Sequence, residues 1–282
     1  MLRINIVTIF PEFFAGPLSL SIPAKAAAAG GVQYSLIDLR DFTHDKHRTV
    51  DDYPFGGGPG MVMKPGPFFD AVASVKATSP IVLLSPRGRR FSHADAVRFA
   101  AGTELTLLCG HYKDIDERVA QHLATEELSL GDFVLSGGEP AALAIVDATV
   151  RLLPGAMSDL ESARTDSFFD RGISAPSYTR PAEYAGHTVP DVLLGGDHAK
   201  VAAWRDNESL RRTREAEARD REDWARREAE STARDAAIAE VERRAAEKAA
   251  KKARAKDGRA RAAKRAANAA NESTGHANGE ST

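Results

Sequence analysis

The chain has 282 residues, of which 43% are hydrophobic, 28% are charged and one is a cysteine, and its formal net charge is −2. This length allows one large domain and a smaller one. No apolar run approaches the roughly eighteen residues of a membrane span, and no signal-peptide pattern is present, so we expect no membrane association. A single cysteine excludes an internal disulfide, so we expect a cytoplasmic protein.

The first part of the chain alternates between strand-like and helix-like segments. Four apolar runs predict buried strands: 2–10, 32–39, 81–84 and 105–109. Segments with helical spacing lie between them: 24–29, 68–77 and 93–101. Ser92 is placed to cap the last of these helices, and we expect Cys109 to be a small buried hydrophobic residue.

The alternation continues toward residue 155. A helix is predicted to begin at the acidic pair Asp116 and Glu117, 130–135 is predicted as the next strand, and 141–153 as an apolar helix. Strands that alternate with helices indicate an α/β fold with a mainly parallel sheet. In such sheets ligands bind at the carboxyl ends of the strands, where glycine lets the backbone approach a ligand.

Composition divides the chain into four predicted parts: a pocket-forming domain over 1–160, a polar linker over 161–186, a small helical domain over 187–235 and an Ala/Lys/Arg-rich flexible tail over 236–282. Residues 249–270 hold eight Lys or Arg and one Asp, an excess of seven positive charges. A basic tail favours an anionic partner such as a nucleic acid. A solvated helix without a partner is the alternative.

Six segments, in order over most of residues 1–205, carry a family resemblance: Arg40–Asp52, Gly56–Met61, Leu84–Pro86, Ile115–Val119, Gly131–Glu139 and Tyr178–Pro181. In these segments the chain resembles bacterial tRNA (guanine-N(1))-methyltransferases of the SPOUT class, which have a trefoil knot and use S-adenosylmethionine. The resemblance implies a deep trefoil knot in which the chain from about 84 to 140 threads itself. It also implies a homodimer whose sites are shared between subunits.

The activity implied by the resemblance is methyl transfer to ring nitrogen 1 of the guanine immediately 3′ of the anticodon in tRNA. The implied cofactor residues are Ser85, Pro86, Gly88, Gly110, Tyr112, Leu130, Gly131, Asp132, Phe133, Val134, Leu135, Gly137 and Gly138. Asp166 matches the family's proposed general base, and Arg151 matches an arginine that balances charge on the guanine. The glycine loop 56–60 is either part of the site or a structural turn.

Some positions depart from the family pattern. Where the family has Cys-Gly-Arg-Tyr-Glu-Gly, the chain has Cys109-Gly-His-Tyr-Lys-Asp114, so Lys113 replaces a carboxylate. A role for Mg²⁺ is therefore left open, with Asp114 as the substitute carboxylate. We predict no metal ligands, because His44 and His47 lack a third soft ligand nearby. Two other functions stay open: a SPOUT-class methyltransferase acting on another RNA position, and a non-catalytic RNA-binding protein.

Overall fold

The computed structural model describes residues 1–78, 80–157, 165–169 and 172–223, together with 225, 226, 229, 232 and 243. The chain divides into two compact units, Met1–Ser209 and Leu210–Thr282. Residues 249–282, which carry the predicted basic tail, lie outside the described part. The division into four parts stays a prediction.

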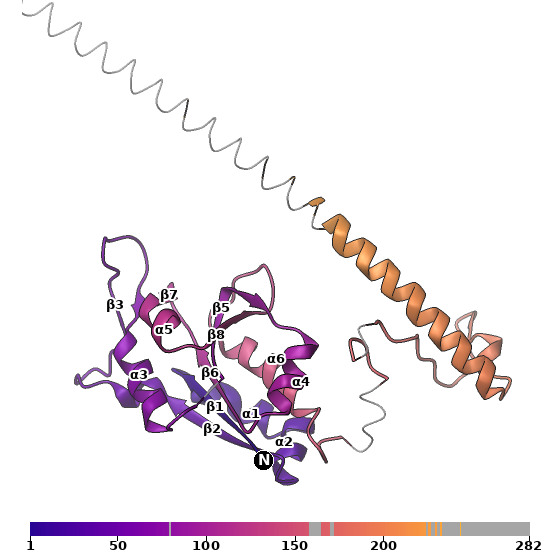
Figure 1. The fold of residues 1–282 in the computed structure, drawn as a ribbon, viewed down its shortest axis with the longest axis horizontal. Coiled ribbons are helices and arrows are strands. Elements are labelled where there is room, and N and C mark those ends of the chain that lie inside the picture. The colour runs from indigo at the N-terminus through magenta and orange to yellow at the C-terminus, as the bar shows by residue number, and fades with distance from the viewer. Residues whose placement is uncertain are drawn as a thin grey trace, which may run out of the picture. The chain divides into compact units, whose positions relative to one another are not determined.

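A five-stranded sheet forms the centre of the first unit (Figure 1). Its strands are β1 (Leu2–Thr8), β2 (Val32–Asp38), β5 (Ile81–Arg90), β6 (Glu104–Cys109) and β8 (Glu126–Ser129). They lie in the order β2-β1-β6-β5-β8, and every neighbouring pair is parallel. The predicted α/β class with a mainly parallel sheet is confirmed.

Helices cover both faces of this sheet (Figure 1). On one face pack α2 (Ser21–Ala28), α4 (His93–Ala100) and α6 (Glu139–Val150). On the other pack α3 (Pro65–Ser74) and α5 (Glu117–His122). Because both faces are covered, every residue of β6 and all of β1 except Arg3 are buried, as is usual for the central strands of a parallel sheet.

Successive side chains of β6 point to opposite faces of the sheet and so belong to different halves of the core. Leu105, Leu107 and Cys109 pack into the cluster under α6, whereas Leu108 points to the cluster under α3. All four side chains are fully buried. Each buried leucine contributes about 1.5–3 kcal/mol relative to an exposed one, so this strand is a main source of stability. The prediction that Cys109 is a buried hydrophobic residue is confirmed.

Shorter elements complete the described part of the chain. They are η1 (Pro11–Phe14), α1 (Ala15–Leu18), η2 (Leu39–Phe42), β3 (Asp51–Asp52), β4 (Val62–Met63), β7 (Asp114–Ile115), β9 (Glu183–Tyr184), β10 (His187–Thr188) and η3 (Asp191–Leu193). Residues 198–223 are helical. Among the described residues, no helix is both long and apolar enough to cross a membrane.

The predicted cap of α4 is present. Ser92 and Asp95 form a capping box, in which the Asp95 carboxylate accepts from the backbone N–H of Ser92 at 2.9 Å. Arg89, at the end of β5, donates two hydrogen bonds of 2.8 Å to the same carboxylate. Hydrogen bonds from Arg89 outweigh burial and lower the pKa of Asp95. The charged carboxylate therefore ties the end of β5 to the start of α4.

The strand predicted over 130–135 is wrong. The strand β8 ends at Ser129, and the backbone then turns because the Ser129 hydroxyl bonds to both the N–H and the carbonyl of Gly131. Phe133 and Val134 are 54% and 83% exposed, so the apolar residues that suggested a strand do not enter the core. They belong instead to a loop that leads into α6.

Gly88 lies where β5 crosses directly over β8. Leu84 and Arg89 both pair with Leu128, so the four residues between them leave the sheet and return. A Cβ on Gly88 would lie 2.6 Å from the backbone of Glu127 and Leu128. Only glycine permits this approach, because the opposing atoms are main chain and have little freedom to move.

We therefore predict that Gly88→Ala lowers the free energy of unfolding by about 1–3 kcal/mol, the usual cost of forcing atoms into a packed region. The matched control is Gly66→Ala in α3, where a Cβ meets nothing within 4 Å. That variant should change the free energy of unfolding by no more than about 1 kcal/mol, because Gly66 lies in the first turn of α3 before Pro67. Urea unfolding followed by circular dichroism measures both. Equal stability of the two variants would contradict the close crossing.

Candidate functional site

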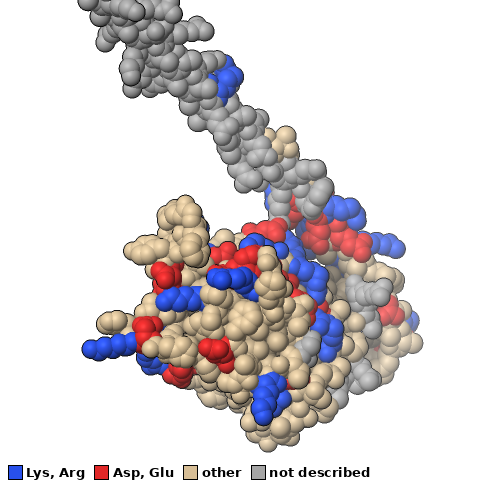
Figure 2. Space-filling view, turned by 60° about the vertical axis from the view of Figure 1, so that its left-hand side comes forward, with Lys and Arg blue, Asp and Glu red and all other residues tan. Residues whose placement is uncertain are grey.

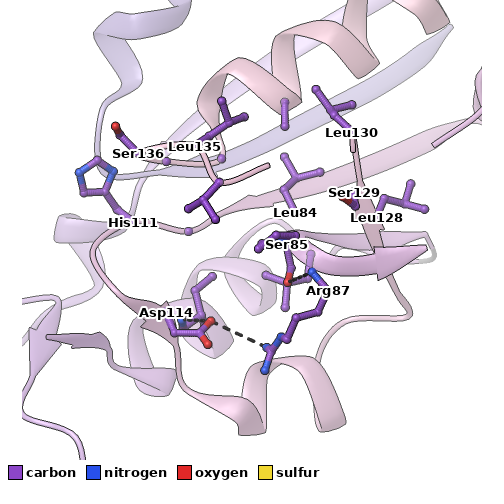
Figure 3. Close-up of a pocket in the computed structure, with 18 of the residues that line it drawn as sticks. Leu84, Ser85, Arg87, His111, Asp114, Leu128, Ser129, Leu130, Leu135 and Ser136 are labelled. Atoms are coloured by element: carbon purple, nitrogen blue, oxygen red, sulfur yellow. Dashed lines mark hydrogen bonds and ion pairs between the residues drawn. The ribbon is translucent and has the colours of Figure 1, made fainter. Parts of the chain in front are cut away.

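Three loops at the carboxyl ends of β5, β6 and β8 surround a cavity (Figure 3). The space between them is about 850 Å³, including the part open to solvent. Its lining combines apolar side chains, bare glycine backbone and a few charged groups, which is typical of sites for small molecules. This is the sheet edge at which α/β folds bind ligands.

The first loop is the excursion of β5 between Leu84 and Arg89. The backbone N–H of Arg87 donates to the Ser85 hydroxyl at 3.2 Å, which tightens the turn. Ser85, Pro86 and Arg87 line the cavity, and Figure 3 shows Arg87 reaching toward Asp114 on the facing loop. Gly88 does not line the cavity, since it lies against the β8 backbone instead.

The second loop follows β6. Cys109 is fully buried, and burial, together with the nearby Glu139 carboxylate, raises the pKa of its thiol well above the ordinary value. The thiol is therefore protonated at neutral pH, which excludes it as a thiolate nucleophile. Beyond it, Gly110 and Tyr112 line the cavity, and Tyr112 has a φ of +61°, which turns the chain across the cavity mouth.

The third loop connects β8 to α6. A Cβ on Gly131 would lie 2.7 Å from the Phe133 ring, so this ring folds back over its own loop. Gly138 lies against the end of β6: its N–H donates to the Gly110 carbonyl at 2.9 Å, and a Cβ there would lie 2.8 Å from Cα of Cys109. The second and third loops therefore contact each other through backbone atoms.

The glycine loop 56–60 reaches the rim of the same cavity through Lys113. A Cβ added to Gly60 would lie only 3.0 Å from the Cβ of Lys113, so the glycine packs directly against the Lys113 side chain. The strand β4, which follows the loop, pairs with β7, which contains Asp114. The loop therefore supports the cavity rim from outside, whichever ligand the cavity holds.

The cavity brings together all but two of the predicted cofactor residues: Ser85, Pro86, Gly110, Tyr112, Leu130, Gly131, Phe133, Val134, Leu135, Gly137 and Gly138. The exceptions are Gly88 and Asp132, and Asp132 pairs with Arg90 at 2.6 Å. Arg87, His111 and Asp114 also line the cavity but were not predicted to bind the cofactor. Each of the three lies next in sequence to a predicted residue or to Lys113, and this adjacency could have pointed to them.

The two predicted catalytic residues lie together but away from this cavity. Arg151 donates to the Asp166 carboxylate at 2.6 Å. Arg151 follows α6 at its carboxyl end, whereas Gly138 precedes the same helix at its amino end. With 12 residues in α6 and a rise of about 1.5 Å per residue, the two ends of this helix lie roughly 18 Å apart.

Asp166 also lines a second hollow, formed by residues of the 165–209 segment. Tyr178, Arg180 and Arg205 contribute to its wall. The Tyr178 and Trp204 rings lie 6.4 Å apart, so this hollow combines aromatic and cationic groups around a carboxylate. Within the described ranges, no group of three or more His, Cys, Asp or Glu residues is arranged to hold a metal ion.

The sequence was compared with known proteins. The family model for tRNA (Guanine-1)-methyltransferase TrmD matches residues 2–223. The chain is 53% identical to the tRNA (guanine-N(1)-)-methyltransferase of Geobacillus kaustophilus (strain HTA426) over 215 residues, 75% of this chain and 88% of that protein. It is 51% identical to the same-named protein of Gloeobacter violaceus over 76% of this chain and 96% of that protein.

A third relative is the tRNA (guanine-N(1)-)-methyltransferase of Bacillus subtilis (strain 168). It is 48% identical over 216 residues, which cover 75% of this chain and 89% of that protein. The matched segment includes all three cavity loops as well as Arg151 and Asp166. Because the family model covers far more than half of the sequence, the chain belongs to the tRNA (guanine-1)-methyltransferase (TrmD) family.

Proposed function

We propose that the chain transfers a methyl group from S-adenosylmethionine to ring nitrogen 1 of the guanine immediately 3′ of the anticodon in tRNA. The observation that carries this proposal is the cavity at three glycine-containing loops, within a chain of this family. The decisive experiment is base-resolved mapping of the methyl group on transcribed tRNA. Methylation of another position, or none, would overturn the assignment.

The cavity fits such a donor in shape and chemistry. Leu84, Leu130 and Leu135 give it an apolar side suited to the adenine ring (Figure 3). At Gly110, Gly137 and Gly138 the backbone is bare, so its N–H and C=O groups can approach the edges of a base. When bound, the donor supplies an electrophilic methyl group on a sulfonium. We propose the predicted cofactor residues that line the cavity as its contacts.

The remaining chemistry falls to Asp166 and Arg151. Guanine N1 carries a proton, and the ring becomes nucleophilic once this proton is removed. In our proposal the Asp166 carboxylate takes that proton, N1 forms a bond to the methyl carbon, and the carbon–sulfur bond breaks with its electron pair on sulfur. Arg151, which holds Asp166 at 2.6 Å, supplies positive charge for the guanine carbonyl oxygen.

A homodimer completes the site in this proposal. Within one chain, α6 begins at the cavity and ends at Arg151, and its length of roughly 18 Å exceeds the about 3–3.5 Å within which the reacting atoms of methyl transfer must lie. A second copy that places its linker over the cavity would bring Asp166 to the donor. The separation along α6 is the support for this arrangement, together with the family resemblance.

The knot and the cellular location are proposed from the family resemblance alone. We propose that residues of about 84–140 form the deep trefoil knot, and that the reaction takes place in the cytoplasm. Mg²⁺ stays an open possibility. At the Lys113 position its usual carboxylate is replaced, and Asp114 forms an ion pair with Arg87 at 3.8 Å.

We propose that tRNA binds through several separate surfaces. On the face shown in Figure 2, acidic and basic side chains are intermingled. Many basic side chains of the first unit are also held in ion pairs, such as Arg98 with Glu126 at 2.9 Å. Such a face offers the RNA backbone little net attraction. The hollow around Asp166, with Tyr178 and Arg205, has groups suited to stacking and phosphate contact. The basic tail would add a salt-dependent attraction.

Donor binding tests the cavity. A Cβ on Gly137 would lie 2.3 Å from Oε2 of Glu139 and 2.6 Å from Nδ1 of His111. Gly137→Val must therefore displace this turn, and we predict that it weakens S-adenosylmethionine binding at least tenfold in calorimetry. The control Gly16→Val, where a Cβ meets nothing within 4 Å, should bind as the unmodified protein does. Equal affinity of all three proteins would refute the placement.

Asp166→Asn tests the base. The amide keeps the shape of the side chain and still accepts a hydrogen bond from Arg151, but it cannot take up the proton. We predict unchanged donor affinity and a single-turnover methylation rate lowered by about 10²–10⁴-fold, the usual effect of removing a general base. Asp70→Asn, at an exposed carboxylate 3.7 Å from His44, is the control. A rate equal to that of the control would show that Asp166 is not the base.

A further inference from the structure

The cavity has one charged end. Of the side chains that line it, Arg87, Lys113 and Asp114 carry formal charge at neutral pH, and they come from two facing loops. In Figure 3, Arg87 and Asp114 point toward each other at this end, whereas Leu130 and Leu135 lie at the other. A ligand that is apolar at one end and charged at the other would therefore bind in one orientation.

Arg87 is held in place from outside the cavity. Its guanidinium lies 3.1 Å from Glu117 on α5 and 3.6 Å from Glu127 on β8. Glu127 Oε1 is buried and accepts no hydrogen bond in the described part of the chain, so the nearby arginine charge compensates it. Glu117 lies at Nη1 of Arg87, and Nη2 lies near both Glu127 and Asp114, so these carboxylates hold the guanidinium at the charged end of the cavity.

Asp114 has acceptor capacity to spare. Its Oδ1 accepts from the N–H of Ile115 at 2.9 Å and lies 3.8 Å from the Arg87 guanidinium. Its Oδ2 has no hydrogen-bond partner among the described residues. Both side chains of the pair are about half exposed, at 48% and 49%. An ion pair this long and this wet contributes little stability, so a ligand separates it at small cost.

We propose that this pair binds the amino-acid end of the methyl donor, with Asp114 receiving the α-ammonium group and Arg87 the α-carboxylate. The inference rests on the proposed function and deepens it. An arginine fork matches a carboxylate, and an aspartate offers an acceptor to an ammonium group, so the zwitterion replaces one weak ion pair with two charge-assisted contacts. The adenine then lies against the leucines at the apolar end.

Two ligands that differ only at this end test the inference. S-adenosylhomocysteine carries the ammonium and carboxylate groups, and 5′-methylthioadenosine lacks both while keeping the adenine, ribose and sulfur. Calorimetry with the full-length protein gives both affinities for the unmodified chain, Asp114→Asn and Arg87→Gln. A hydrogen bond to a charged group is worth enough for us to expect about a tenfold or larger loss for S-adenosylhomocysteine in each variant. The affinity for 5′-methylthioadenosine should stay within about twofold.

Control variants separate recognition from folding. Arg118→Gln removes an arginine that also bridges a carboxylate, Asp116 at 2.7 Å, but does not line the cavity, and it should bind both ligands normally. Asp114→Glu, which keeps the charge, should recover part of the lost affinity. An equal loss for both ligands, or no loss for either, would overturn the inference. Failure of the unmodified chain to bind S-adenosylhomocysteine would overturn the proposed function itself.

Discussion

The turn at Gly137 and Gly138 has no room for side chains, and the cavity depends on this restriction. Gly138 presses against the backbone of Cys109 and Gly110, and Gly137 lies beneath His111 and Glu139. Glu139, which begins α6, is buried and accepts a hydrogen bond from Thr8 on β1 at 2.7 Å. One short segment thus joins β1, the end of β6 and the start of α6. The bare backbone at this junction is the surface that we propose the donor meets.

Helix α6, which begins at this junction, also separates the cavity from Arg151. Because α6 starts at the cavity and ends beside Arg151, its length of roughly 18 Å separates the two ends of the helix. This separation supports the proposed homodimer, in which the linker of a second copy brings the proposed base, Asp166, to the donor. In the structure, Arg151 and Asp166 form an ion pair with each other.

Sequence patterns predicted most of the sheet, because both of its faces are covered and its central strands are rich in buried apolar residues. They failed at 130–135, where Phe133 and Val134 look like strand residues but the Ser129 hydroxyl turns the chain. Gly88 was assigned to the cofactor through the family resemblance, and in the structure it lies against the backbone of β8. Arg87 and Asp114, which form the charged end of the cavity, come from two loops far apart in sequence. Sequence periodicity does not predict that these loops lie side by side.

The central claim is that cavity and base come from different copies of the chain. Mixing Gly137→Val chains with Asp166→Asn chains, after dissociation and reassembly, tests it most directly. In a mixed dimer, the intact cavity of one chain would meet the intact Asp166 of the other. At a donor concentration that saturates only an intact cavity, single-turnover methylation should therefore exceed that of either variant alone. Activity no greater than the sum of the two separate variants, with mixed dimers shown to be present, would contradict the account.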